Sequence, residues 1–437
     1  MAALRLAGPG SRKILDRLFR PQTDVEDRPF MLRFGLFVSS KGEKLDEIMA
    51  VHMPRGRSYT GLEQVEIFCH GGRRIVRLIL EELIKGGARA AQPGEFTKLA
   101  FLNGRISLAR AEAVAEIIAA NTDSSYRASR EHLLGAYAEH IEKLREQLVA
   151  VLADIEASID FSEEEIDPGT NVQHGKALAA IEKQVQELLS SYSGGRIINE
   201  GFKIAIGGRP NAGKSSLFNL LLKQERALVN PEAGTTRDYL SEWIDLEGFA
   251  VNLIDTAGLR AGSSGVEKEG QVRAEEIIKR ADLTLWMFDL SEKEWPEVLR
   301  ADLRKFIEAP MLLVGNKIDI PAEVAAAGFR DAAEAVRISC LTKKGLKELR
   351  QELLRRINER MPDLTSGLVV TSARHQQRLS AAGKAIGRAR RKIKSNESPE
   401  ITAFELRQGI EALDEITGRI YNEEILGKIF SSFCIGK

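Results

Sequence analysis

Residues 208–215 read Gly-Arg-Pro-Asn-Ala-Gly-Lys-Ser, and they decide the fold of the central part of this chain. An apolar run at 202–207 comes before them and predicts a buried strand, while the stretch 214–222 predicts a helix. Small residues at such a junction let backbone N–H groups converge on phosphate oxygens at the positive end of the helix. Lys214 would reach the terminal phosphates, and Ser215 would offer its hydroxyl to Mg²⁺. The nucleotide contacts predicted in this loop are Asn211, Ala212, Gly213, Lys214, Ser215 and Ser216.

The base of the nucleotide can also be predicted. Residues 316–319, Asn-Lys-Ile-Asp, follow a second apolar run at 311–315. A carboxylate at Asp319 can accept hydrogen bonds from the ring N–H and the exocyclic amine of guanine, whereas adenine lacks this pair of donors. A third loop, 339–341, follows the run 335–338 and is expected to pack on the base through its backbone. The predicted base contacts are Asn316, Lys317, Asp319, Ser339, Cys340 and Leu341.

Two further loops complete a GTP-binding domain of the Ras-like, doubly wound α/β type. Residues 255–258, Asp-Thr-Ala-Gly, follow a strand predicted at 251–254, so that Asp255 would hold Mg²⁺ through water and Gly258 would sense the γ-phosphate. The segment 233–238 lies where the first switch is expected. The contacts predicted in these two loops are Asp255, Thr256, Ala257 and Gly258, with Thr236 as the second Mg²⁺ ligand beside Ser215.

The residue after Gly258 is informative. Many small GTPases orient the attacking water with a Gln at this position, but this chain has Leu259, which cannot do so. Either hydrolysis is slow or another group positions the water. A carboxylate at Glu267 can polarise a water, although spacing alone favours this role no more than an ordinary solvated charge.

Composition limits the other classes of function. The 437 residues suffice for two or three domains with full cores, and 63 basic residues balance 63 acidic ones. Binding to nucleic acid must therefore depend on a local patch rather than on net charge. Three Cys without a pairing pattern are typical of a reducing compartment, and no run approaches the roughly 20 apolar residues of a membrane span. We expect a soluble cytoplasmic protein that does not bind membranes.

The chain is expected to divide into four parts. Residues 1–105 predict a small α/β domain, and 106–201 are helix-rich, with a Gly-containing linker at 191–201. The GTPase domain spans 202–361, and 362–437 are helical again. Helices before and after an inserted domain can pack together, although two independent helical units would give the same pattern.

Three features lie outside the GTPase motifs. The segment 374–395 carries many Lys and Arg and no acidic residue, so it is either an RNA-contacting helix or a solvated helix face. Cys434, near the end of the chain, could be a nucleophile, a ligand or a small buried hydrophobe. Cys69 and His70 lack a third metal ligand, and the two Gly after them are more typical of a turn.

The combined motifs resemble the tRNA-modification GTPase family named MnmE or TrmE. The resemblance runs almost from end to end and is carried by the GTPase loops together with flanking segments that other translation-linked GTPases lack. Those segments are 65–72 (Val-Glu-Ile-Phe-Cys-His-Gly-Gly), 93–97 (Pro-Gly-Glu-Phe-Thr), 101–104 (Phe-Leu-Asn-Gly), 111–115, 160–167 and the terminal Phe-Cys-Ile-Gly-Lys at 433–437.

The resemblance implies a concrete activity. The family modifies C5 of the wobble uridine of certain tRNAs, as a homodimer that forms a heterotetramer with an FAD-dependent partner of the MnmG or GidA type. K⁺ drives its GTPase domains to dimerise, and the K⁺ ligands fall on Asn211, Asn230, Glu232 and Thr235. The carboxylate that polarises water falls on Glu267, with Lys214 as its catalytic companion. A tetrahydrofolate derivative supplies one carbon, with contacts that fall on Arg5, Glu66, Arg105 and Lys437, and Cys434 would lie near this pocket.

One departure from the family is visible. The family's N-terminal domain opens with a strand and a Gly-rich loop before the stretch that matches 3–9, whereas this chain begins inside that stretch. We therefore expect a truncated small sheet, which would weaken the folate pocket, the Arg5 contact and any dimer built from this domain. Two alternatives follow: a GTPase switch that serves as an adaptor in ribosome or RNA assembly, and a scaffold whose folate pocket is inactive.

Overall fold

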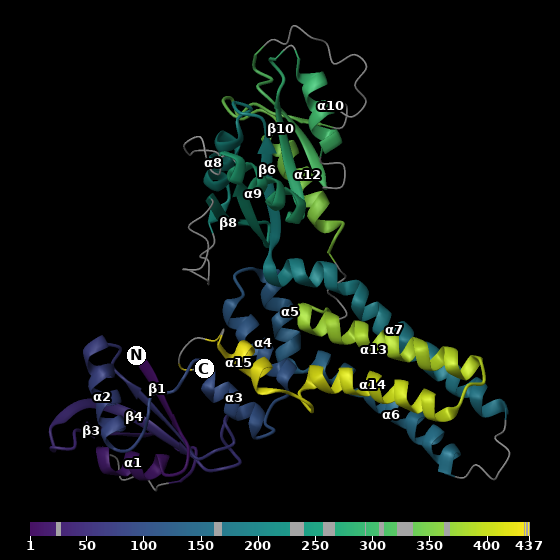
Figure 1. The fold of residues 1–437 in the computed structure, drawn as a ribbon. Coiled ribbons are helices and arrows are strands. Elements are labelled where there is room, and N and C mark those ends of the chain that lie inside the picture. The colour runs from purple at the N-terminus through teal and green to yellow at the C-terminus, as the bar shows by residue number, and fades with distance from the viewer. Residues whose placement is uncertain are drawn as a thin grey trace. The chain divides into compact units, whose positions relative to one another are not determined.

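The computed structural model of the chain describes residues 1–22, 28–160, 168–227, 240–256, 267–292, 294–305, 310–320, 335–361, 368–431, 433 and 436 (Figure 1). These residues form two compact units. The first unit comprises Met1–Ala115, His132–Leu178 and Lys384–Lys437, and the second comprises Glu116–Glu131 and Ala179–Gly383.

The second unit contains a mixed seven-stranded sheet. Its strands are β6 (Phe202–Gly208), β7 (Arg226–Ala227), β8 (Leu240–Leu246), β9 (Phe249–Asp255), β10 (Leu283–Asp289), β11 (Met311–Asn316) and β12 (Val336–Arg337). They lie in the order β12-β11-β10-β6-β9-β8-β7. The strands from β12 to β9 are parallel, and β8 pairs antiparallel with both β9 and β7. This arrangement confirms the predicted doubly wound GTPase-like fold, and the predicted strands at 202–207, 251–254 and 311–315 are present.

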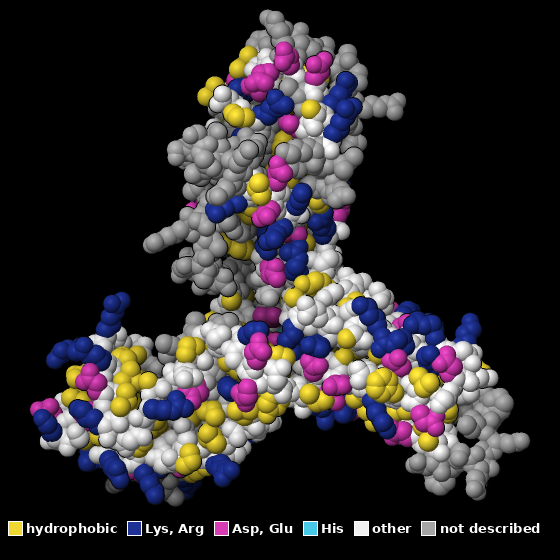
Figure 2. Space-filling view, in the orientation of Figure 1, with side chains coloured by type: hydrophobic (Ala, Val, Ile, Leu, Met, Phe, Trp, Pro, Cys, Tyr) yellow, Lys and Arg dark blue, Asp and Glu magenta, His cyan; other side chains and the backbone are white. Residues whose placement is uncertain are grey.

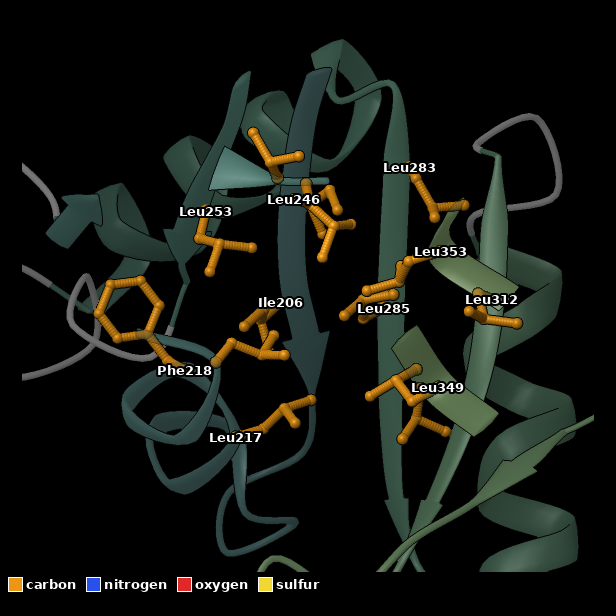
Figure 3. Packing of buried hydrophobic residues seen from close by; sticks show 14 of the residues in the cluster. Ile206, Leu217, Phe218, Leu246, Leu253, Leu283, Leu285, Leu312, Leu349 and Leu353 are labelled. Carbon is orange, nitrogen blue, oxygen red and sulfur yellow. The ribbon is translucent and has the colours of Figure 1, made fainter. Parts of the chain in front are cut away.

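Helices cover both faces of this sheet because its inner strands are apolar on both sides. Leu283 and Leu285 of β10 join one core cluster, whereas Trp286 and Phe288 of the same strand join the other. Figure 3 shows the first cluster, in which side chains of α8 and α12 meet those of the strands. The second cluster is closed by α9 and α10. These helices are α8 (Lys214–Gln224), α9 (Glu267–Arg280), α10 (Trp295–Lys305) and α12 (Leu346–Asn358).

The first unit begins with a five-stranded antiparallel sheet in the order β1-β5-β4-β3-β2. Two helices pack on it through buried residues such as Leu15, Ile79 and Leu83, which meet Ile48 and Ile67 of the strands. The elements are β1 (Ala2–Ala7), α1 (Ser11–Leu18), β2 (Phe19–Pro21), β3 (Arg33–Val38), β4 (Lys44–Met53), β5 (Gln64–Cys69) and α2 (Arg73–Lys85).

The remaining helices are α3 (Glu95–Leu102), α4 (Leu108–Ala119), α5 (Asp123–Leu134), α6 (Ala136–Asp160), α7 (Pro168–Glu200), α13 (Ala373–Lys394), α14 (Pro399–Thr417) and α15 (Glu423–Ser431). None of the described helices is long and apolar enough to cross a membrane.

Helices α6 and α14 lie side by side within the first unit (Figure 1). The predicted apolar face of α6 is buried at Leu144 and Leu148, and α14 buries Leu406 and Leu413. Ion pairs flank this packing: Arg407 with Glu156 at 2.7 Å, Arg419 with Glu142 at 2.5 Å, and Arg145 with Asp414. Helices that come before and after the GTPase domain in the sequence therefore pack on each other, as expected.

The predicted linker at 191–201 is wrong, because α7 continues as a helix to Glu200. Glycine weakens an isolated helix, but here it permits a close tertiary contact. A Cβ on Gly195 would lie 2.2 Å from the carbonyl oxygen of Val370, and the Val370 N–H donates to Oγ of Ser191 at 3.0 Å. The segment at 369–370 thus holds this end of α7 in place.

Two glycines of α7 provide a matched test. Replacing Gly by Ala inside a helix usually stabilises it by about 0.5–1 kcal/mol, and Gly175→Ala should do so because no atom lies within 4 Å of the added Cβ. Gly195→Ala should instead lower the free energy of unfolding by about 1–3 kcal/mol, since Val370 must move. Urea unfolding followed by circular dichroism measures both, and equal stabilisation by the two variants would contradict the packing of α7 against 369–370.

Candidate functional site

The predicted nucleotide loops meet at one edge of the seven-stranded sheet. Strand β6 pairs in parallel with β9 and β10, and β10 pairs in parallel with β11. Their carboxyl ends, Gly208, Asp255, Asp289 and Asn316, therefore lie at the same edge. Ligands of open α/β sheets bind at this edge, so the topology brings the separate motifs together.

The phosphate loop is shaped by close backbone approach. Gly208 and Gly213 have φ angles of 131° and 100°, and Asn211 has a φ of 65°. A Cβ on Gly208 would lie 2.2 Å from the Met287 carbonyl oxygen, and one on Gly213 would lie 2.2 Å from the amide nitrogen of Asn316. Neither position can hold a side chain without a shift of its neighbours.

Lys214 and Ser215 begin α8, where backbone N–H groups and the helix dipole favour an anion. The Lys214 ammonium group donates to the carbonyl oxygen of Arg209 at 2.7 Å, so the buried side chain spans the loop. Ser215 is exposed and donates its hydroxyl to Oδ2 of Asp255 at 2.8 Å. A hydroxyl and a carboxylate side by side are the hard oxygen donors that Mg²⁺ prefers, so these residues fit that ion.

Asn316 connects three of the predicted loops. Its amide nitrogen donates to the carbonyl oxygen of Ala212 at 2.9 Å, and its amide oxygen accepts from the N–H of Cys340 at 3.1 Å. Asn316 is 3% exposed, so both bonds are shielded from water. A residue predicted as a base contact therefore ties the phosphate loop to the loop at 339–341.

The base-binding side of the site combines an exposed carboxylate with a buried wall. Asp319 is exposed, whereas Cys340 is partly buried and Ser339 is fully buried. Burial, together with the nearby Asp319 carboxylate, raises the pKa of Cys340 to about 11, so the thiol is neutral at physiological pH. The Ile318 N–H donates to the carbonyl oxygen of Ile338 at 3.2 Å, so Asp319 follows a residue that is bound next to the loop at 339–341. A carboxylate in this position can accept the two hydrogen bonds that guanine donates.

One residue of this edge was missed by the sequence analysis. Asp289 ends β10, and its side chain is 5% exposed. Its carboxylate pairs with the Lys317 ammonium group and accepts bonds from the hydroxyl and the N–H of Ser291 at 2.6 and 2.9 Å. Burial alone would raise the pKa of Asp289, but the bonds from Lys317 and Ser291 outweigh it and lower that pKa. The available signal was an acidic residue at the end of an otherwise apolar run, 283–289.

A second cluster lies on the antiparallel sheet of the first unit. Arg5 contacts Oε1 of Glu66 through Nε at 2.9 Å and through a terminal nitrogen at 2.8 Å. The Arg5 guanidinium group also lies 5.2 Å from the ring centre of Tyr59 and 5.5 Å from that of Phe96. Gln64 donates to the same Oε1 at 3.1 Å. Among the described residues, no donor contacts Oε2 of Glu66. That oxygen fits a group that donates hydrogen bonds, such as the amine and ring N–H of a pterin.

The other predicted residues of the first unit are only partly brought together. Arg105 donates to the carbonyl oxygen of Gly56 at 3.2 Å, in the same loop that carries Tyr59. His70 binds Asp46 through Nδ1 at 2.7 Å, and Cys69 is buried. Within the described ranges, no group of three His, Cys, Asp or Glu side chains is placed to hold a metal ion.

Comparison with known proteins covers nearly the whole chain. A model of the MnmE helical domain matches residues 108–434, and a model of the GTP-binding protein TrmE N-terminus matches residues 1–105. The tRNA modification GTPase MnmE of Aquifex aeolicus (strain VF5) is 39% identical over 438 residues, which are 99% of this chain and 96% of that protein. The chain belongs to the MnmE family.

The tRNA modification GTPase MnmE of Akkermansia muciniphila is 40% identical over 100% of this chain and 96% of its own length. The G domain of the T. maritima FeoB iron transporter matches 36% of this chain at 27% identity, with a TM-score of 0.27.

This MnmE-family GTPase also has predicted site residues that lie outside the described part of the chain. They are the switch residues Asn230, Glu232, Thr235 and Thr236, the residues Ala257 and Gly258, the side chain of Glu267, and the terminal Cys434 and Lys437. The backbone of Glu267 begins α9.

Asp289→Asn tests the buried ion pair of this MnmE-family chain. The lowered pKa of Asp289 means that its charge stabilises the folded state at neutral pH and that this contribution is lost as pH falls below the ordinary Asp value of about 4. The variant should be less stable by about 1–3 kcal/mol at pH 7, and this difference should shrink toward pH 3. Urea unfolding across this pH range measures it, with Ser291→Ala as a control that keeps the charge. A difference independent of pH would rule out the ion pair as its cause.

Proposed function

We propose that this MnmE-family GTPase uses GTP hydrolysis to drive modification of C5 of the wobble uridine in tRNA. The observation that supports this proposal most strongly is the pair of hydrogen bonds made by the Asn316 amide, which joins the phosphate loop to the loop at 339–341, as a single guanine-nucleotide site requires. The names of the Aquifex aeolicus and Akkermansia muciniphila relatives support the tRNA substrate. We infer a homodimer that acts in a heterotetramer with an FAD-dependent partner of the MnmG or GidA type.

The described residues have distinct roles in this proposal. Lys214 neutralises the terminal phosphates, and the N–H groups at the start of α8 receive their oxygens. Asp319 accepts the donors of guanine, while Asp289 keeps Lys317 in place beside it. Because Asn316 is shared by both halves of the site, the base and the phosphates are held in one geometry.

Two ions complete the proposed site. Ser215 and Thr236 would hold Mg²⁺, with Asp255 behind them, and Asn211, Asn230, Glu232 and Thr235 would hold K⁺. Cations held by these residues would supply positive charge beside the γ-phosphate. Asn211 is exposed in the phosphate loop and carries an amide oxygen of the kind that hard cations bind, which supports the K⁺ assignment. Glu267 would polarise the attacking water in place of the Gln that Leu259 replaces.

The Arg5–Glu66 cluster supports a tetrahydrofolate site in the first unit. Oε2 of Glu66 can accept from the amine and ring N–H of a pterin, and the partly buried Tyr59 lies on the other side of Arg5. Arg105 would contact a folate carboxylate, and Lys437 and Cys434 are proposed neighbours of the same pocket. A bound tetrahydrofolate derivative would supply the one-carbon unit that the modification needs.

GTP hydrolysis should depend on the monovalent cation. We expect the rate to be at least tenfold higher in K⁺ than in Na⁺ at equal ionic strength, because a cation of the right size replaces an arginine finger. Steady-state phosphate release measures both rates, and Lys214→Ala serves as the inactive control. Equal rates in the two salts would contradict the K⁺ mechanism but not the GTPase activity itself. No hydrolysis in either salt would contradict the whole proposal.

Folate binding separates the modification enzyme from the adaptor and scaffold alternatives. Equilibrium titration with tetrahydrofolate should show binding that Glu66→Gln weakens by about tenfold or more, since an amide cannot accept two charge-assisted bonds. Glu43→Gln, at an exposed acidic residue between β3 and β4, is the control for a general loss of charge. Absence of binding by the unchanged chain at high micromolar folate would favour the adaptor or scaffold.

A further inference from the structure

The carboxylate of Glu66 is bound through one oxygen only. An Arg and a carboxylate frequently pair side by side, so that each oxygen accepts one hydrogen bond. Here Nε and a terminal nitrogen of Arg5 both contact Oε1 of Glu66, at 2.9 and 2.8 Å, and no donor of the described residues contacts Oε2. A rotation of the Glu66 carboxylate would let Arg5 take both oxygens, so a further contact is needed to keep Oε2 free.

Other cations do not occupy this carboxylate. Figure 2 shows Lys and Arg side chains over the surface of the part of the chain that carries β1–β5. Within the described ranges, Arg5 is the one cation that pairs with Glu66. The side chain of Glu66 is 21% exposed, which leaves it accessible to a ligand, while its partial burial strengthens a hydrogen bond made there.

Gln64 supplies the further contact. It lies two residues before Glu66 on β5, so both side chains point to the same face of the sheet. The amide nitrogen of the fully buried Gln64 donates to Oε1 of Glu66 at 3.1 Å. Arg5 lies opposite Glu66 on the neighbouring strand β1, whereas Gln64 lies along the same strand. Oε1 is therefore held from two directions, which resists rotation of the carboxylate.

The turn before β5 fixes the orientation of the Gln64 amide. The amide oxygen accepts from the N–H of Thr60 at 3.4 Å and from its hydroxyl at 3.2 Å. A backbone N–H can only donate, so the amide oxygen must face Thr60 and the amide nitrogen must face Glu66. The same nitrogen lies 3.8 Å from the sulfur of Met53 on β4. Both ends of the amide are thus paired in a single orientation.

Asn103 connects this turn to helix α3. Its amide nitrogen donates to the carbonyl oxygen of Thr60 and to that of Leu99 in α3, both at 2.8 Å. The contacts therefore run from α3 through the turn to Gln64 and end on Oε1 of Glu66. A buried polar network in which each member is paired is rigid, so the position of the carboxylate is set before a ligand arrives.

We propose that Gln64 is a positioning residue for folate binding, which holds Glu66 by one oxygen and keeps Oε2 available to the amine of a pterin. The inference rests on the proposed tetrahydrofolate site. A ligand then meets a carboxylate that is already oriented, which reduces the entropy lost on binding. Without the Gln64 amide, Arg5 takes both oxygens, and the ligand must break an ion pair to bind. Gln64 thereby sets the preference for a pterin that carries the amine.

The ratio of two affinities tests the inference. Equilibrium titration of the full chain compares tetrahydrofolate with an analogue that lacks the 2-amino group of the pterin. The unchanged chain should prefer tetrahydrofolate by about tenfold or more, because the analogue leaves a hydrogen bond to a charged group unmade. Gln64→Met keeps the length of the side chain but cannot donate, so it should reduce this ratio by about fivefold or more.

Two further variants exclude a general loss of structure as the cause. Gln64→Glu keeps an acceptor for Thr60 but cannot donate to Glu66, so it should lower the ratio as Gln64→Met does. Met53→Leu removes the sulfur beside the same amide and leaves the donor to Glu66 in place, so it should keep the ratio. Circular dichroism verifies that each variant is folded.

The outcomes separate this inference from the proposed function. If Gln64→Met and Gln64→Glu weaken binding of both ligands equally, or of neither, Gln64 serves only the fold and the inference is overturned, while the folate site stands. If the unchanged chain binds both ligands equally well, the inference is also overturned, since Oε2 then does not receive the amine. If the unchanged chain binds neither ligand at high micromolar concentration, the folate part of the proposed function fails together with the inference.

Discussion

The amide of Asn316 is the interaction on which the nucleotide site depends. It reaches from the end of β11 to the phosphate loop and, through its other atom, to the loop at 339–341. The contact is possible only because residue 213 is Gly, since a Cβ there would occupy the space of the amide nitrogen. A buried amide with both of its groups paired is costly to disturb, so three loops distant in sequence behave as one structure.

The same edge shows how a charged group can be buried in a site that binds an anion. Asp289 places a negative charge close to where phosphates and base would lie, and Lys317 and Ser291 compensate it. In return, the long Lys317 side chain has a defined position rather than many rotamers. Preorganisation of this kind lowers the entropy lost when a ligand binds.

Much of this architecture could be predicted from local patterns. The strands at 202–207, 251–254 and 311–315 were recognised because each is a short apolar run that ends in a polar motif, and the apolar face of α6 followed from helical spacing. Asp289 was missed because a single acidic residue after a strand has no distinctive spacing. The linker predicted at 191–201 is wrong because the propensity of glycine does not reveal the contact that Val370 makes with α7. Residues of the first switch and the chain end stay predictions, since they lie outside the described ranges.

The sequence by itself determined the class of nucleotide, because the chemistry of guanine and phosphate recognition is carried by short contiguous motifs. It also determined the family, because flanking segments as specific as Cys-His-Gly-Gly and Phe-Cys-Ile-Gly-Lys occur with those motifs in one chain. Only the tertiary structure decided that Asn316 joins the loops, that no donor among the described residues contacts Oε2 of Glu66, and that α13 ends beside the start of α7. These facts depend on distances between residues far apart in the chain, which packing sets and which no local pattern records.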